Sequence, residues 1–240
     1  MVYLSTVSRR GTSHSDWNED NFFIKEMAHV VVGGIFDGCS SGKDSFFASK
    51  LFANIFRKTV DECETRIEVD TFPTLVHQFF KNLSKAIKTI GLTTDETLST
   101  AVLFIYNLNN NELLVKFFGD GCAYANNDEL LFFNNDEENK PDYVSYQLSD
   151  LLKSPYAYTN YYKGKKSFIV NTKDFSISSD GLFSFRKTID SEPDFNYTNY
   201  LVKDDFLYKN PASLKRKLNI IKNKGYEHYD DLTIIRIIIE

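Results

Sequence analysis

The sequence predicts an α+β protein built from layered sheets and helices. Apolar runs rich in Val, Ile and Phe form two groups of β-type segments, with two long segments of helical apolar spacing among them. This grouped order differs from a regular strand–helix alternation and is typical of the α+β class. Hydrophobic residues make up 42% of the 240 residues, enough for a sizeable core. Because no repeat and no Pro/Gly-rich linker interrupts the chain, we expect a single domain over residues 1–240.

The first part of the chain shows three β-type runs and then two amphipathic helices. The third run is rich in Val and Ile and stops at Asp37-Gly38. Gly91 is expected to end the second helix, because glycine readily adopts the left-handed conformation of a helix C-cap. The predicted elements are strands at 2–8, 21–27 and 29–36 and helices at 41–60 and 70–90.

The second part begins with β-type runs, and its pattern weakens after residue 133. Residues 134–165 are polar and tyrosine-rich, so we interpret them as a surface excursion with some helix near residues 149–153. The remaining predictions are strands at 97–107 and 112–121, a hairpin at 122–133, strands at 167–171 and 175–178, helices at 197–208 and 212–221, and a last strand at 232–240.

Composition excludes several classes of protein. The formal net charge of −5 argues against a nucleic-acid or anionic-membrane partner, which would need a basic face. No apolar run is long enough for a membrane span, and the N-terminus lacks the apolar stretch of a signal peptide. The three cysteines, Cys39, Cys63 and Cys122, form neither a disulfide framework nor a CxxC pair. We therefore expect a cytoplasmic protein.

Carboxylates at the predicted strand ends carry the chemical signal. Asp37, Asp120 and Asp180 each follow an apolar run and precede a glycine. Glu19-Asp20 and Asp230-Asp231 lie directly before apolar runs. If these ends converge, the cluster needs cations, and oxygen ligands favour Mg²⁺, Mn²⁺ or Ca²⁺. Asp-Gly is also a common turn signal, so this pattern alone leaves a purely structural interpretation open.

Six short motifs follow one another along the chain: Asn18-Glu19-Asp20, Phe36-Asp37-Gly38, Leu98-Ser99-Thr100-Ala101, Gly119-Asp120-Gly121, Ser179-Asp180-Gly181 and Asp230-Asp231-Leu232-Thr233. Taken together and in this order, they resemble the PP2C (PPM) family of metal-dependent protein serine/threonine phosphatases, in a divergent bacterial-type branch. The resemblance covers residues 18 to 233 and implies a four-layer α-β-β-α sandwich of two antiparallel sheets flanked by helices. It also implies that residues 134–165 occupy the place of a flap near the substrate.

The resemblance also implies roles at a site for two Mn²⁺ or Mg²⁺ ions. Asp37 would bridge both ions and Gly38 would contribute its carbonyl, while Asp180 and Asp230 would complete one ion. Glu19 and Asp20 would act through waters, Asp120 would help to hold a weaker third ion, and Ser99-Thr100 would be structural. A hydroxide shared by the two ions would attack phosphorus. The implied catalytic residues are Asp37, Asp180 and Asp230.

Two positions depart from the family pattern. Ser15 stands where the family has an arginine that grips the substrate phosphate, and Cys39 stands where a histidine often serves as general acid. His14, Arg9 or Arg10 is a candidate to replace the arginine. All the metal ligands that the family pattern requires are present, and only the residues that would contact the substrate phosphate or donate a proton are changed. We therefore still predict hydrolysis.

Residue spacing argues against several other kinds of site. No cysteine is followed by arginine at the spacing of a cysteine phosphatase, and around Lys43 a P-loop would need glycine where Asp37 stands. The four histidines lack zinc-site spacing. The alternative that stays open is a weak or inactive pseudophosphatase that acts as a binding or regulatory module. The family implies a phosphorylated protein substrate and a paired serine/threonine kinase, although the residues do not exclude phosphotyrosine or a small phosphate ester.

Overall fold

The computed structural model describes residues 1–14, 16–42, 45–125, 128–132, 141–152, 167–188 and 195–240. Within them, two five-stranded antiparallel sheets and one two-stranded sheet form. The strands are β1 (Val2–Arg9), β2 (Asp20–Glu26), β3 (Val30–Asp37), β4 (Ala101–Asn107), β5 (Glu112–Phe118), β6 (Cys122–Ala125), β7 (Asp128–Phe132), β8 (Ser167–Asn171), β9 (Asp174–Ser178), β10 (Phe185–Lys187), β11 (Tyr226–His228) and β12 (Leu232–Ile239).

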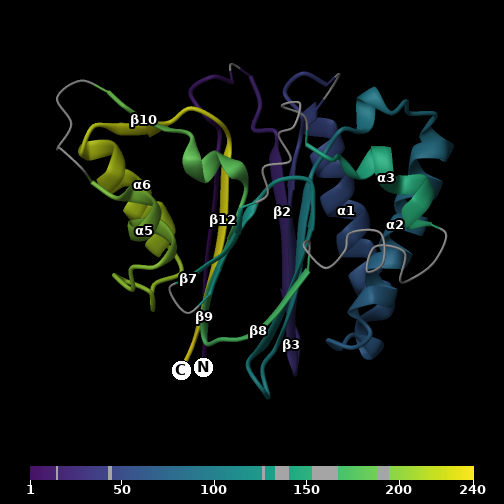
Figure 1. Ribbon diagram of the computed structural model, residues 1–240, viewed down its shortest axis with the longest axis horizontal. Coiled ribbons are helices and arrows are strands. Elements are labelled where there is room, and N and C mark those ends of the chain that lie inside the picture. Colours follow the sequence, from purple (N-terminus) through teal and green to yellow (C-terminus); the bar gives the residue numbers. More distant parts are fainter. Residues whose placement is uncertain (15, 43–44, 126–127, 133–140, 153–166, 189–194) are drawn as a thin grey trace.

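The two large sheets lie face to face, and helices cover both outer faces (Figure 1). One sheet has the order β1-β12-β9-β6-β7 and the other β2-β3-β4-β5-β8. The helices α1 (Ser45–Cys63), α2 (Phe72–Ile90) and α3 (Val144–Leu151) cover the second sheet, while α5 (Tyr197–Val202) and α6 (Ser213–Asn223) cover the first. The predicted α+β fold and its four-layer sandwich are thus confirmed.

Three apolar layers hold the sandwich together. The central layer joins the facing sheets through side chains such as Ile35, Phe104 and Ile235. An outer layer of aromatic rings, among them Phe36 and Phe79, packs α1 and α2 on the second sheet. Because both faces of β3 are covered, Val30–Phe36 is buried along its whole length, which explains why this strand reads as a continuous apolar run.

The first part of the chain contains each element predicted for it, although α1 begins at Ser45 rather than at residue 41 and ends at Cys63 rather than at residue 60. Helix α2 ends at Gly91 in the left-handed conformation (φ +79°), and the Gly91 N–H donates to the Ile87 carbonyl, as predicted. No helix in the part of the chain that the structure describes is long and apolar enough to cross a membrane.

The second part differs from prediction in several places. Strand β4 begins at Ala101 rather than at residue 97, because Asp95–Thr97 forms a 3₁₀ turn, and β5 ends at Phe118 rather than at residue 121. Helix α3 begins at Val144, earlier than the predicted residue 149, and one face of this piece of the 134–165 excursion packs in the core through Val144, while Tyr146 is exposed. The helix predicted over 197–208 ends at Val202. The β10–β11 pair was not predicted, because three-residue strands carry too little alternation. Residues 133–140 and 153–166 lie outside the described residues.

Strand register brings the predicted carboxylates to one end of the sandwich. Asp20, at the start of β2, pairs directly with Asp37, at the end of β3. In the other sheet β9 and β12 are antiparallel, so Asp180 just after β9 and Asp230 just before β12 lie at the same edge. Asp120 follows the end of β5, which pairs with the start of β4.

Candidate metal and phosphate site

A small pocket of about 110 Å³ lies at this end of the sandwich. It brings together side chains from both sheets and from the segment before α3. Five of the seven predicted ligand residues line it, together with Cys39, Ser40, Thr100, Pro141 and Tyr143. The five are Asp37, Gly38, Asp120, Asp180 and Asp230.

Asp20 lies behind the pocket and supports its floor. Its side chain is buried, and the Ser179 hydroxyl donates to its Oδ2 atom at 2.8 Å. The same Ser179 oxygen accepts the Thr233 N–H at 3.0 Å, so one serine joins β2 to the ends of β9 and β12. Asp20 is therefore fixed by both sheets.

Gly181 lets the two acidic segments of the first sheet approach each other. A Cβ atom built on Gly181 would lie only 1.8 Å from the Asp231 carbonyl oxygen, so no larger residue fits. Gly181 belongs to a short 3₁₀ turn at Asp180–Phe183, which Asp180 begins. The Asp-Gly pair thus allows the close approach that places Asp180 beside Asp230 at the pocket.

Ser99 and Thr100 connect the segment after β3 to β4. The Thr100 N–H donates to the Asp37 carbonyl at 2.8 Å, and Ser99 forms an antiparallel bridge with Gly38. These contacts agree with the structural role that the sequence motif implies. They also show that Thr100 lies at the pocket wall, which the sequence interpretation did not state.

The clustered carboxyls hold their protons more tightly than usual. Burial raises the pKa of Asp20 to about 7, and the charges of Asp180 and Asp231 add to the shift. Burial, followed by the charges of Asp20, Asp180 and Asp120, raises the pKa of Asp37 well above its usual range. Burial, with the charge of Asp230, also raises the pKa of Asp180. Each shift reports negative charge that water does not compensate.

This donor set fits a hard divalent cation. Among the described residues, Asp20 Oδ1 and Asp180 Oδ1 are buried oxygen atoms without a hydrogen-bond partner. Unpaired buried carboxylate oxygens are costly unless a cation or proton satisfies them. Four of the side chains that line the pocket are carboxylates, the ligands that Mg²⁺ and Mn²⁺ prefer.

The two adjacent aspartates before β12 face different surroundings. The Asp230 side chain is 43% exposed and lines the pocket. The Asp231 side chain is 1% exposed and accepts hydrogen bonds from the backbone N–H groups of Gly11, at 2.6 Å, and Glu19. Asp231 therefore ties the segment before β2 to β12, which the sequence did not reveal.

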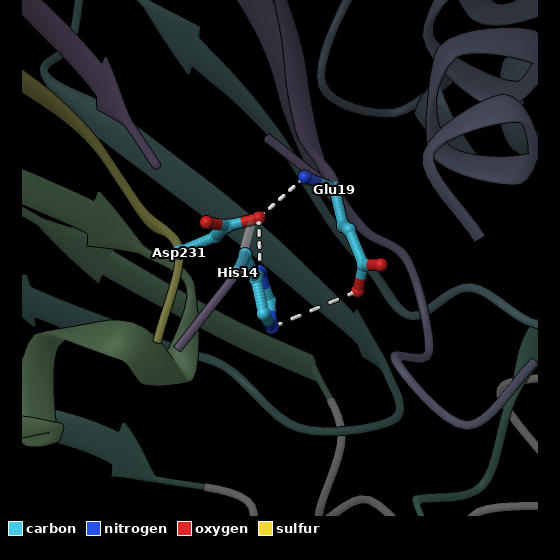
Figure 2. A group of neighbouring side chains, drawn as sticks. All are labelled: His14, Glu19 and Asp231. Atoms are coloured by element: carbon cyan, nitrogen blue, oxygen red, sulfur yellow. Dashed lines mark hydrogen bonds and ion pairs between the residues drawn. The ribbon is translucent and has the colours of Figure 1, made fainter. Parts of the chain in front are cut away.

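His14 lies next to three carboxylates, those of Glu19, Asp230 and Asp231. Figure 2 shows its ring beside Asp231, with Nδ1 2.9 Å from Asp231 Oδ2, and its other nitrogen directed toward Glu19, 4.0 Å from Oε2. The same nitrogen lies 3.6 Å from Asp230 Oδ1 and 3.1 Å from the Ser40 hydroxyl. Glu19 is thus located beside His14 rather than in the pocket lining.

Opposing effects act on the His14 proton. Burial lowers the pKa of His14, but the hydrogen bond to Asp231 and the charges of Asp231, Glu19 and Asp230 outweigh it and raise the pKa above its ordinary value. Among the described residues, His14, Glu19 and Asp231 are also the group whose ligand atoms all lie within 4.8 Å of one another. Because Asp231 already accepts two backbone N–H groups, we interpret the group as a positioning network.

The mouth of the pocket differs from what the family pattern implies. Ser15 lies outside the described residues. Arg9 and Arg10 line a separate hollow rather than this pocket. Tyr143 lines the pocket, and burial with a hydrogen bond to Cys39 raises its pKa. The tyrosine enrichment of residues 143–162 was a signal, but it could not single out Tyr143.

Comparison with known proteins defines the fold. No family model matches the chain, and no curated protein sequence matches it. Three solved structures that it resembles are the serine/threonine phosphatase Stp1 from Staphylococcus aureus, RsbX in complex with magnesium, and the catalytic domain of the serine/threonine protein phosphatase PstP with two manganese ions. The chain has the fold of these bacterial PP2C-type phosphatases.

The likeness extends over whole chains at low identity. Stp1 has a TM-score of 0.62 and 17% identity, with 100% of this chain and 96% of that chain covered. RsbX has a TM-score of 0.57 and 15% identity, with 100% and 96% covered. PstP has a TM-score of 0.57 and 13% identity, with 99% and 97% covered.

Proposed function

We propose that this chain is a PP2C-type protein phosphatase that hydrolyses phosphoserine and phosphothreonine with the help of Mn²⁺ or Mg²⁺. The observation that carries the proposal is the pocket where Asp37, Asp180 and Asp230 meet from two different sheets. Asp180 in this pocket and Asp20 next to it each have a buried carboxylate oxygen without a hydrogen-bond partner, which a bound cation would satisfy. One catalytic domain over residues 1–240 is part of this proposal, and the match to Stp1 over 100% of this chain and 96% of that chain supports it.

The pocket carboxylates would hold the ions. Asp37, the Gly38 carbonyl, Asp180 and Asp230 would hold two ions, and Asp120 would help to hold a weaker third. When bound, the ions would neutralise the carboxylates and make water a stronger nucleophile toward phosphorus. The magnesium of RsbX and the two manganese ions of PstP support this choice of metals.

Residues around the floor would position the ligands and the substrate. Ser179 holds Asp20 against both sheets, and Asp231 fixes His14 and the backbone of Glu19. His14 lies near Asp230 and Ser40, at the edge of the pocket. We therefore propose that His14 takes over part of the role that the family assigns to the missing arginine or histidine, donating a proton or a hydrogen bond to the substrate.

The substrate would be a phosphorylated protein. Stp1 and PstP are serine/threonine phosphatases, which supports phosphoserine and phosphothreonine as substrates here. A serine/threonine kinase of the same cell would supply that substrate, because the proposed reaction needs a phosphate monoester on a protein.

The test compares metal binding and turnover in matched variants. We expect release of phosphate from an aryl phosphate ester only with Mn²⁺ or Mg²⁺. Asp37→Asn and Asp180→Asn should each lower kcat/KM at least about a hundredfold, because bound metals supply several kcal/mol of transition-state stabilisation. Titration calorimetry should show weaker Mn²⁺ binding. Asp61→Asn is the matched control, because Asp61 is half-exposed on α1 and pairs with Lys25.

Two results would contradict the proposal in different ways. If clean protein binds Mn²⁺ but releases no phosphate from any ester, the chain is a pseudophosphatase that keeps the fold as a binding module. If Asp37→Asn binds Mn²⁺ as well as the unaltered protein does, the pocket is not the metal site.

A further inference from the structure

A second hollow lies close to the carboxylate pocket and has the opposite charge. It has a volume of about 290 Å³ and is formed by the end of β1, helix α6 and the β10–β11 pair. We call it the basic groove. The residues that line it include three cationic side chains and three aromatic rings: Arg9, Arg10, Lys222, Phe185, Tyr226 and His228.

Positive charge dominates this groove. Glu227 is the carboxylate among its lining residues, and it pairs with Lys222 at 3.0 Å. Arg9 and Arg10 are both exposed, and the Lys222 side chain is 71% exposed. In a chain of net charge −5, this concentration of cations on one concave surface favours an anionic partner.

The groove is connected to the pocket through two hydrogen-bonded segments. The Thr12 N–H donates to the His228 carbonyl at 3.2 Å, and the Ser13 N–H donates to the Tyr229 carbonyl at 2.9 Å. One segment then reaches His14. The other reaches Asp230, two residues after His228, which corresponds to about 7 Å of extended chain.

The wall between groove and pocket carries a further cation and an exposed ring. The Arg186 guanidinium lies 3.6 Å from the centre of the Tyr229 ring, which is a cation–π contact. Tyr229 is 42% exposed and immediately precedes Asp230. Between the groove and Asp230, this part of the surface therefore offers a positive charge and a flat apolar ring.

We infer that the basic groove binds an acidic segment of the phosphoprotein substrate, a few residues away from the phosphorylated residue in the pocket. The inference rests on the proposed function and names its substrate class more closely. An extended peptide advances about 3.3 Å per residue, so acidic side chains three to five positions from the phosphoserine would reach the groove. A folded acidic loop of the same substrate would present the same charges.

The experiment compares peptides that differ only in flanking charge. Phosphoserine peptides would carry three Glu or three Gln residues at positions +3 to +5, and a second pair would carry them at −5 to −3. With Mn²⁺ at low salt, we expect kcat/KM for the Glu peptide of one pair to be about tenfold higher than for its Gln partner, mainly because KM is lower. The preference should shrink as salt is added, because these cations are exposed.

Charge-reversed variants test the groove itself. Arg9→Glu combined with Lys222→Glu should abolish the preference and leave hydrolysis of an aryl phosphate unchanged, which also shows that the variant folds. The matched control is Arg57→Glu with Lys85→Glu, the same change at exposed positions of α1 and α2, and it should keep the preference. Equal use of Glu and Gln peptides by the unaltered protein, or a preference that survives the groove variant, would overturn the inference.

A binding measurement separates this inference from the proposed function. Fluorescence anisotropy of a labelled, unphosphorylated Glu-rich peptide should report binding that the groove variant weakens and the control variant does not, whether or not the protein hydrolyses esters. Failure of aryl phosphate hydrolysis with peptide binding intact would reject the proposed function alone. Equally strong binding of an oligouridylate of the same charge would overturn the choice of an acidic peptide.

Discussion

The floor and the mouth of the carboxylate pocket are built in different ways. The floor consists of Asp37 at the end of β3 and Asp180 just after β9, with Asp20 at the start of β2 behind them. The mouth is formed by His14 and Cys39, which lie in connecting segments, together with Tyr143, just before α3.

This difference indicates how much substitution each part of the site can tolerate. Register couples Asp20 to Asp37 and fixes them together, so a change in one strand would displace both. The mouth is held by a few side-chain contacts, such as Asp231 with His14 and Ser41 with Cys39. Metal binding would thus tolerate little change, while substrate handling can be rebuilt from neighbouring residues.

Replacing His14 is the strongest way to test whether the mouth contributes to chemistry. His14→Gln keeps a hydrogen-bonding side chain beside Asp231 but removes the proton donor. We expect kcat/KM for a phosphoserine peptide to fall about a hundredfold, the contribution typical of a general acid. An aryl ester with a good leaving group should lose much less, since its leaving oxygen needs little protonation.

The ratio of the two losses separates the possible roles of His14. Equal losses on both substrates would indicate that His14 binds the phosphate. Unchanged kinetics on both would exclude it from the reaction and leave the mouth without an identified donor. The matched control is His29→Gln, the same change on the exposed turn between β2 and β3.

The metal-free floor should make stability depend on pH. The pKa of Asp20 rises from 3.8 to about 7 on folding, so between these values the folded state binds more protons than the unfolded state. The free energy of unfolding should therefore fall as pH rises from about 4 to 7, by about 1.4 kcal/mol per pH unit from this carboxyl. Urea unfolding in EDTA at pH 5.5 and 7.0 measures the slope.

Two comparisons sharpen that result. Asp20→Asn should flatten the slope, because the neutral amide needs no proton and still accepts from Ser179. Saturating Mg²⁺ should stabilise the protein more at pH 7.0 than at pH 5.5, because the ion competes with protons for the same oxygens. A metal-free protein that is more stable at pH 7.0 would contradict the crowded-carboxylate description of the floor.

Cys39 should show the smallest effect. Cys39→Ala removes a thiol that contacts Ser41 at 3.1 Å and Tyr143, at a half-exposed position. We expect aryl phosphate hydrolysis to change by less than about twofold, the effect of a peripheral contact worth about 0.5 kcal/mol. A collapse of activity would show that Cys39 acts in catalysis, and Cys63→Ala provides a control for the loss of a thiol elsewhere.

Most of the floor could be predicted from the sequence, while most of the mouth could not. Asp37 and Asp180 end β-type runs and precede glycine, so local pattern and motif order located them. Tyr143 reaches the pocket because Val144 packs in the core and its N–H donates to the Ser99 carbonyl, which is a long-range contact. The sequence did not indicate the buried face of α3, because this helix lies in a polar, tyrosine-rich segment without a clear apolar period.

By itself, the sequence determined the α+β class, the strand ends and the acidic residues placed on them, since these depend on periodicity and on neighbours in the chain. Only the tertiary structure decided which of two adjacent aspartates faces the pocket. Asp230 lines it, while Asp231 turns away to accept backbone N–H groups from Gly11 and Glu19. The reason is that the partners of Asp231 lie more than 200 residues away along the chain and approach it only when the first strand pairs with the last.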